Sequence, residues 1–180
     1  MKPRHCRAAW LAAITLACGG LTLSPGAGAA VVYQTAEAFI STAFAGSPPR
    51  AAVLWFTRGI RSGVREILGH DYPTLRLRYW LRDGRSAWVL EEIGKERPIT
   101  LGVVVEGGRV AQVRVLIYRE SRGAEVRRSF FTGQFRGAAL TGRLDLDRDI
   151  DGISGATLSV RAVKKLVRLA LFLDGQVRGQ

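Results

Sequence analysis

The sequence predicts a single α+β domain, in which two β-hairpins form a largely antiparallel, twisted sheet and helices pack against it. Apolar and polar residues alternate over successive short segments, and turn dipeptides join these segments in pairs. Apolar residues also recur at helical spacing near both ends of the 180-residue chain. Because neighbouring strands follow one another directly, and no Gly-x-Gly-x-x-Gly follows a strand, a parallel dinucleotide-binding sheet is not expected.

The first 29 residues have the features of a secretory signal peptide. Lys2, Arg4 and Arg7 form a basic start, an apolar run follows from Trp10 to Leu23, and Ala27-Gly28-Ala29 suits cleavage. The apolar run is short for a membrane span. We therefore expect a periplasmic or otherwise extracytoplasmic mature protein, with retention of this segment as an anchor as the alternative.

Composition excludes several kinds of site. Both cysteines, Cys6 and Cys18, lie in the predicted signal segment, and His70 is the only histidine after it. A zinc, haem or Ser-His-Asp site is therefore not expected, and His70 is interpreted as a structural or surface residue. Three positive charges of the net +12 also lie in that segment, which leaves +9. A basic protein can bind nucleic acid or anionic membranes, but export makes nucleic acid a poor partner.

Residues 30–97 are expected to hold two helices, a short strand and the first hairpin. Apolar spacing predicts one helix over Tyr33–Ala45, ended by Gly46-Ser47-Pro48-Pro49, and a second from Ile60 to Leu68, closed by Gly69. Val53–Phe56 reads as a short strand between them. We assign no chemistry to these elements.

Two hairpins follow. The strands over residues 75–82 and 85–93 are joined by Asp83-Gly84, and those over residues 99–105 and 110–118 by Gly107-Gly108. In the first strand Arg76, Arg78 and Arg82 share one face with Trp80. We interpret these arginines as a solvated face, with docking of a partner as the alternative.

The heptapeptide Asp151-Gly152-Ile153-Ser154-Gly155-Ala156-Thr157 precedes a helical pattern that runs from Leu158 to about Leu173. Gly152 and Gly155 allow backbone conformations closed to other residues, and Ser154 and Thr157 are both N-cap residue types. The first N–H groups of a helix lack internal partners and attract anions, so a phosphate next to a hydroxyl would suit this position.

This heptapeptide resembles the flavin-attachment motif of the FMN-binding domain family, which includes components of the sodium-pumping NADH:quinone oxidoreductase and of the Rnf electron-transport complex. The resemblance covers roughly Pro98–Leu173, and residues 98–175 are expected to form the domain's core. It implies that Thr157 carries FMN through a phosphoester bond made by a flavin transferase. Ser154, Gly155 and Ala156 would complete the cofactor site, and Asp151 and Gly152 would be recognised by the transferase.

The resemblance also implies a place for the isoalloxazine ring. The family carries a Gly-x-Glu stretch and an aromatic segment before its motif, matched here by Gly123 and Glu125 and by Phe130 and Phe131. A flavin ring needs an apolar wall and a few polar contacts. The alternative interpretation is ordinary core for Phe130 and Phe135 and a surface ion pair for Glu125.

A calcium loop is a rival interpretation of the same region. Asp147, Asp149 and Asp151 have the spacing of the first half of such a loop, with Gly152 after them. The twelfth position, where calcium needs a bidentate Glu, is Leu158. These acids are therefore weak metal candidates, and no metal is expected.

The last helix has two faces. An apolar stripe is expected to pack on the sheet, and a basic stripe of Arg161, Lys164, Lys165 and Arg168 is left for water or, alternatively, for a membrane surface. The resulting hypothesis is an exported electron-transfer protein with covalent FMN and a membrane or periplasmic redox partner, rather than a self-sufficient enzyme. The alternative is a flavin-free exported binding module that is calcium-dependent or membrane-associated. The apolar stripe consists of Val160, Val163, Val167, Ala170 and Leu171.

Overall fold

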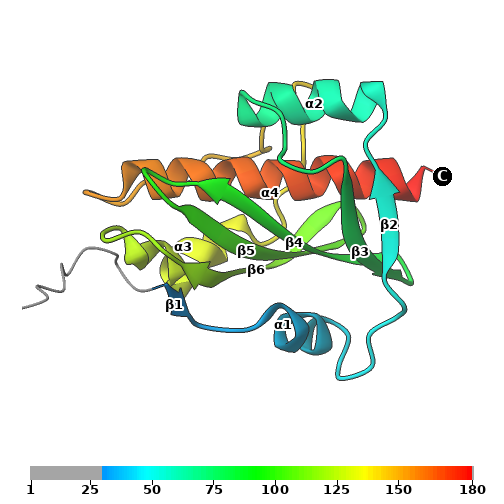
Figure 1. Ribbon diagram of the computed structural model, residues 1–180, viewed down its shortest axis with the longest axis horizontal. Helices are drawn as coiled ribbons and strands as arrows, with labels where there is room; N and C mark the ends of the chain where they lie inside the picture. The colour runs from blue at the N-terminus through cyan, green and yellow to red at the C-terminus, as the bar shows by residue number, and fades with distance from the viewer. Residues whose placement is uncertain (1–29, 180) are drawn as a thin grey trace, which may run out of the picture.

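A computed structural model describes residues 30–179, and the predicted signal peptide lies outside them. Within these residues, six strands form one antiparallel sheet in the order β1-β6-β5-β4-β3-β2 (Figure 1). The α+β prediction with two central hairpins is confirmed. The strands are β1 (Val31–Val32), β2 (Ala52–Trp55), β3 (Arg76–Arg82), β4 (Arg85–Ile93), β5 (Pro98–Glu106) and β6 (Arg109–Tyr118).

Helices cover both faces of the sheet (Figure 1). On one face α4 (Thr157–Arg178) packs on β4, β5 and β6, and α2 (Arg58–Leu68) packs on α4. On the other face α1 (Ala36–Ala43) contacts β4 and β5. The larger apolar core lies between the sheet and α4, and a smaller one lies under α1. The helix that carries the predicted attachment motif at its start, α4, therefore packs on the larger of the two cores.

The hairpins form for the reasons that the sequence suggests. Asp83, Gly84, Gly107 and Gly108 all have positive φ, as tight turns between paired strands require. Alternation then sends Ala87 into the core under α1, and Trp88 and Leu90 into the core under α4. The helix predicted over Tyr33–Ala45 is shorter, because Thr35 caps it by accepting the Ala38 N–H at 3.1 Å.

Two details of α4 correct the sequence-based expectation. The helix continues past Leu173 to Arg178, and its N-cap is Ala156, not Ser154 or Thr157. Thr157 already has helical conformation, so its hydroxyl cannot serve as the N-cap acceptor.

Two of the four residues of the basic stripe of α4 bind neighbouring segments, whereas Arg161 is exposed as expected. Lys165 Nζ donates to the Leu68 carbonyl at the end of α2, and Arg168 donates to the Leu144 carbonyl and pairs with Asp145 at 3.1 Å. The apolar stripe is buried as predicted. In the part of the chain that the structure describes, no helix combines the length and apolarity that a membrane crossing needs.

The segment between β6 and α4 holds three short turns that the sequence did not reveal. These are η1 (Ala124–Arg127), α3 (Ser129–Thr132) and η2 (Gly133–Phe135). Phe131 and Phe135 anchor them in the main core, with ring centroids 5.4 Å apart in an edge-to-face arrangement. Because of these anchors, η1 and η2 are held against β6, and η1 also contacts α4.

Candidate functional site

Thr157 is the first residue of α4, and its side chain is exposed. Gly155 has φ +80, which allows the chain to turn sharply into the helix. Among residues 30–179 no side chain caps this helix, and its first turn contains no acidic residue. The N–H groups of that turn are therefore free to bind an anion beside the Thr157 hydroxyl.

A buried polar contact supports the first turn from below. Ser159 is buried, and its Oγ lies 2.8 Å from the Tyr118 hydroxyl at the end of β6. The Tyr118 hydroxyl donates its single hydrogen to the Arg122 carbonyl, so Ser159 is the donor to Tyr118. Burial raises the pKa of Tyr118, which keeps the phenol neutral and able to donate.

Gly123 fits closely against this contact. Its φ is +86, and a Cβ there would lie 2.9 Å from both Ser159 Oγ and the Tyr118 hydroxyl and 3.3 Å from the Ala156 Cβ. Gly123, the first residue of the Gly-x-Glu stretch, therefore lies against Ala156, the N-cap residue of α4, as expected if the stretch and the motif belong to one site. Only glycine can occupy this position without displacing the start of the helix.

The first residue of the motif, Asp151, is hydrogen-bonded to η2. The Asp151 N–H donates to Gln134 Oε1 at 2.7 Å, and the Ala156 N–H donates to the Ile153 carbonyl at 3.0 Å. Asp151, Gly152 and Ser154 are exposed. Gly152, unlike Gly155, has no positive φ, so the expected need for glycine conformation holds at only one of the two positions.

The three residues expected near a flavin ring, and the neighbouring Phe135, differ in exposure. Glu125 is exposed in η1, and Phe130 is 59% exposed at the start of α3. Phe131 and Phe135 are fully buried in the core. The core interpretation is therefore wrong for Phe130 and confirmed for Phe135, and no ion pair of Glu125 occurs among residues 30–179.

The first of the acids before the motif, Asp147, is bound by other groups of the protein. Asp147 accepts the Ala139 N–H at 3.0 Å, which lowers the pKa of its carboxyl, and it pairs with Arg148 at 3.2 Å and Arg109 at 3.3 Å. Among residues 30–179 no group of three or more His, Cys, Asp and Glu side chains could hold a metal. The Asp147 carboxylate is thus bound by two neighbouring arginines and by the main-chain N–H of Ala139.

Several residues that build the site have no local sequence signal. Ser159 and Tyr118 are 41 positions apart, and Gln134 and Asp151 are 17 apart. Outside the site, Glu120 makes contacts that also lack a local signal: one of its carboxylate oxygens accepts the main-chain N–H groups of Lys95, Glu96 and Arg97 in the β4–β5 turn. Burial opposes ionisation of Glu120, but these bonds lower its pKa overall.

Residues 94–171 match the family model described as the FMN-binding domain. The matched span begins at the β4–β5 turn and includes β5, β6, the three short turns, the motif loop and most of α4. No curated protein matches the chain at a significant level.

Proposed function

We propose that this chain, whose residues 94–171 belong to the FMN-binding domain family, carries its FMN covalently on Thr157 and acts in electron transfer. The match to the family model supports FMN as the cofactor. The observation that supports Thr157 as the attachment residue is its exposed hydroxyl at the start of an uncapped helix. When bound, FMN supplies one- or two-electron redox chemistry.

The residues of the motif fit this role. The first-turn N–H groups of α4 bind the phosphoryl group, and the helix dipole favours its negative charge. Gly155 and the buried Ala156 shape the turn, and the exposed Ser154 lies beside it. Asp151 and Gly152 are exposed, as recognition by a separate flavin transferase requires.

Intact-mass measurement after co-expression with a flavin transferase tests the attachment. Wild type should gain the mass of one FMN less one water, because an ester forms between a phosphate and a hydroxyl. Thr157→Val keeps the side-chain shape but removes the oxygen, so it should gain nothing. Ser154→Ala is the matched control and should still be modified, and Asp151→Ala should be modified in lower yield. Covalent flavin on Thr157→Val would refute the assignment.

For the ring, we propose that Phe130 forms the apolar wall and Glu125 a polar contact, with Phe131 supporting Phe130 from the core. Phe130→Ala and Glu125→Gln should then shift the flavin midpoint potential or absorbance spectrum and leave attachment intact. Trp55→Ala, which removes another exposed aromatic side chain, is the control. Spectra and potentials equal to wild type in both ring variants would remove these residues from the site.

We also propose that the mature protein works outside the cytoplasm with a membrane or periplasmic redox partner. The support is the signal-like composition of the first 29 residues. N-terminal sequencing of the periplasmic protein should show a chain starting just after Ala29 or Ala30. A chain that keeps Met1 and stays in the cytoplasm would contradict export.

A further inference from the structure

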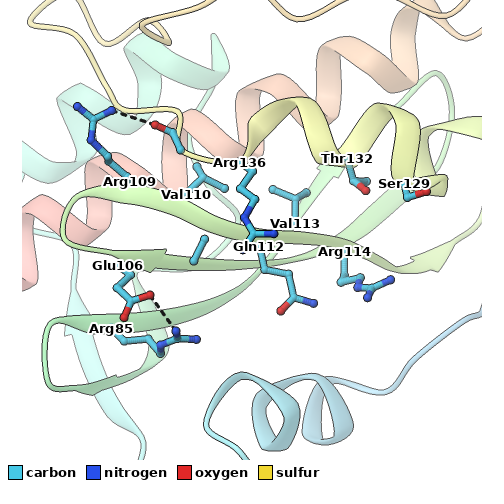
Figure 2. A pocket seen from close by; sticks show the side chains of 13 residues that line it. Arg85, Glu106, Arg109, Val110, Gln112, Val113, Arg114, Ser129, Thr132 and Arg136 are labelled. Atoms are coloured by element: carbon cyan, nitrogen blue, oxygen red, sulfur yellow. Dashed lines mark hydrogen bonds and ion pairs between the residues drawn. The ribbon is translucent and has the colours of Figure 1, made fainter.

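A groove of about 660 Å³ lies over β6, on the side of the sheet that faces α1 (Figure 2). Its walls come from α3 and η2 on one side and from Arg85 and Glu106, at the ends of β4 and β5, on the other. We call it the basic groove, because four arginines and only one acid line it: Arg85, Arg109, Arg114 and Arg136, with Glu106. None of its lining residues belongs to the 151–157 loop.

Two of these arginines have no acidic partner. Arg85 pairs with Glu106 at 2.8 Å and Arg109 with Asp147 at 3.3 Å, whereas no ion pair of Arg114 or Arg136 occurs among residues 30–179. Figure 2 shows the Arg109 guanidinium directed toward a main-chain carbonyl, that of Gly137, to which it donates at 2.9 Å, and Arg136 directed into the groove. Arg114 and Arg136 thus give the groove uncompensated positive charge. Guanidinium groups match carboxylates in shape and charge.

The arrangement suits an extended acidic chain better than a compact anion. In Figure 2 the guanidinium groups of Arg85, Arg136 and Arg114 are set apart along the groove and do not converge on one point. In the described part of the chain no aromatic side chain lines the groove, so those residues offer a nucleotide base or other planar ring no stacking surface there.

The edge of β6 gives a second reason to expect an extended chain. Val110 exchanges hydrogen bonds with Gly137 and Ala138, and the Leu116 carbonyl accepts from Tyr33 and Gln34. Between these points the outer edge of β6 has no strand partner within residues 30–179. The intervening residues Ala111, Gln112, Val113 and Arg114 all line the groove. An extended segment laid along such an edge can pair with its main chain.

The groove also adjoins the attachment loop. Gly133 of η2 lines the groove, and the next residue, Gln134, accepts the Asp151 N–H at the start of the motif. We infer that the basic groove docks an extended acidic segment of the protein that exchanges electrons with FMN. This inference rests on the proposed function, because the partner is defined by that exchange. A partner docked in the basic groove contacts η2, and η2 is hydrogen-bonded through Gln134 to the loop that ends in Thr157.

Binding of a fluorescent octaglutamate peptide, followed by anisotropy at about 0.1 M ionic strength, where the Debye length is about 10 Å, tests the inference. Wild type should bind, and the double variant Arg114→Gln/Arg136→Gln should bind at least about tenfold more weakly, since it loses both uncompensated guanidiniums. The control Arg58→Gln/Arg78→Gln removes the same charge from exposed arginines outside the groove. It should weaken binding less than about threefold, because remote surface charges are partly screened.

Three results would overturn the inference. They are no binding by wild type, equal weakening in the two double variants, and binding to anionic phospholipid vesicles that depends on Arg114 and Arg136 while the peptide does not bind.

Intact mass of the same samples distinguishes failure of the groove proposal from failure of the attachment proposal. Protein without covalent FMN that still binds peptide through the groove would count against the attachment, and fully loaded protein that ignores the peptide would count against the groove.

Discussion

Gly123 is the residue on which the attachment loop depends most closely. A side chain there needs a strained left-handed backbone and meets Ser159 and Tyr118 at 2.9 Å. Gly123→Ala should therefore lower the free energy of unfolding by about 2 kcal/mol or more and reduce covalent FMN. Chemical denaturation and intact mass measure the two effects. Gly59→Ala in α2, where a Cβ meets nothing within 4 Å, should leave both close to wild type. Equal behaviour of the two variants would show that Gly123 is not constrained.

His70 links the end of α2 to β4 in a pH-dependent way. Its Nδ1 lies 2.9 Å from the Asp71 carbonyl and its Nε2 3.1 Å from both oxygens of the buried Glu92. Both partners are acceptors, so only the protonated ring can donate to both. The contact with the Asp71 carbonyl, followed by that with Glu92, raises the pKa of His70 above 6.5, although burial and, less strongly, Lys165 oppose this.

Because the folded pKa is raised, the stabilisation is fully present below the ordinary pKa of His70 and is lost as pH rises through the folded value. The free energy of unfolding should therefore decrease between about pH 5.5 and about pH 8.5 in wild type, and decrease less in His70→Gln. Urea titrations at both pH values measure the difference. The same decrease in the variant as in wild type would exclude His70 as its source.

Single residues differ in how well the sequence reveals them. Thr157, Gly155 and Gly123 could be found because the motif fixes residue types at fixed spacing. Ser159, Tyr118 and Gln134 could not, since a buried hydroxyl pair or a side chain that holds a distant amide follows no periodicity. Phe130 and Phe131 are adjacent and chemically identical, yet only Phe131 is buried. Their difference depends on which side of the single-turn helix α3 faces the core.

Among the elements, α4 carries the motif at its start and is held to β4 near its other end by a completely buried acid, Asp174. Asp174 accepts from Ser86 Oγ at 2.7 Å, and Ser86 accepts from Trp88 Nε1 at 2.8 Å. Arg178 lies 2.6 Å from the second carboxylate oxygen, an ion pair without hydrogen-bond alignment. Burial raises the pKa of Asp174, although Ser86 and Arg178 favour its charged form.

Removing this carboxylate leaves the Ser86 hydroxyl and the Arg178 guanidinium without their partner. Asp174→Ala should therefore cost about 3 kcal/mol of unfolding free energy, measured by chemical denaturation. Asp149→Ala is the matched control: it removes an exposed carboxylate and should change the stability by less than about 0.5 kcal/mol. If the two variants are equally stable, the Asp174 contacts contribute nothing.

The longer elements follow from sequence patterns, and the shorter ones do not. Alternation and Asp-Gly or Gly-Gly turns predict β3 to β6, and apolar spacing predicts α1, α2 and α4. The two-residue strand β1 and the single turns η1, α3 and η2 are too short to show a period. The sequence predicts an end of α4 near Leu173, because Asp174 and Gly175 are residue types that favour a helix end. In the structure Asp174 is buried against β4, and the helix continues to Arg178.

In the molecule as a whole, the matched residues 94–171 do not hold a separate core. Val64, Ile67 and Leu68 of α2 and Trp88 and Leu90 of β4 belong to the same apolar cluster as the buried side of α4. The sequence predicts this α+β class from its strand order. It does not predict that α1 is the helix that packs in the smaller core, because a burial pattern shows that a face of the sheet is covered but not which element covers it.

The most direct test of the account is the site of attachment in wild-type protein matured by a flavin transferase. Trypsin cleaves after Arg148 and Arg161, which releases one peptide, Asp149–Arg161, with Ser154, Thr157 and Ser159 as its only hydroxyl side chains. Fragmentation of this peptide should place one FMN, less one water, on Thr157. An unmodified peptide, or FMN on Ser154 or Ser159, would contradict the assignment of Thr157 as the flavin-bearing residue.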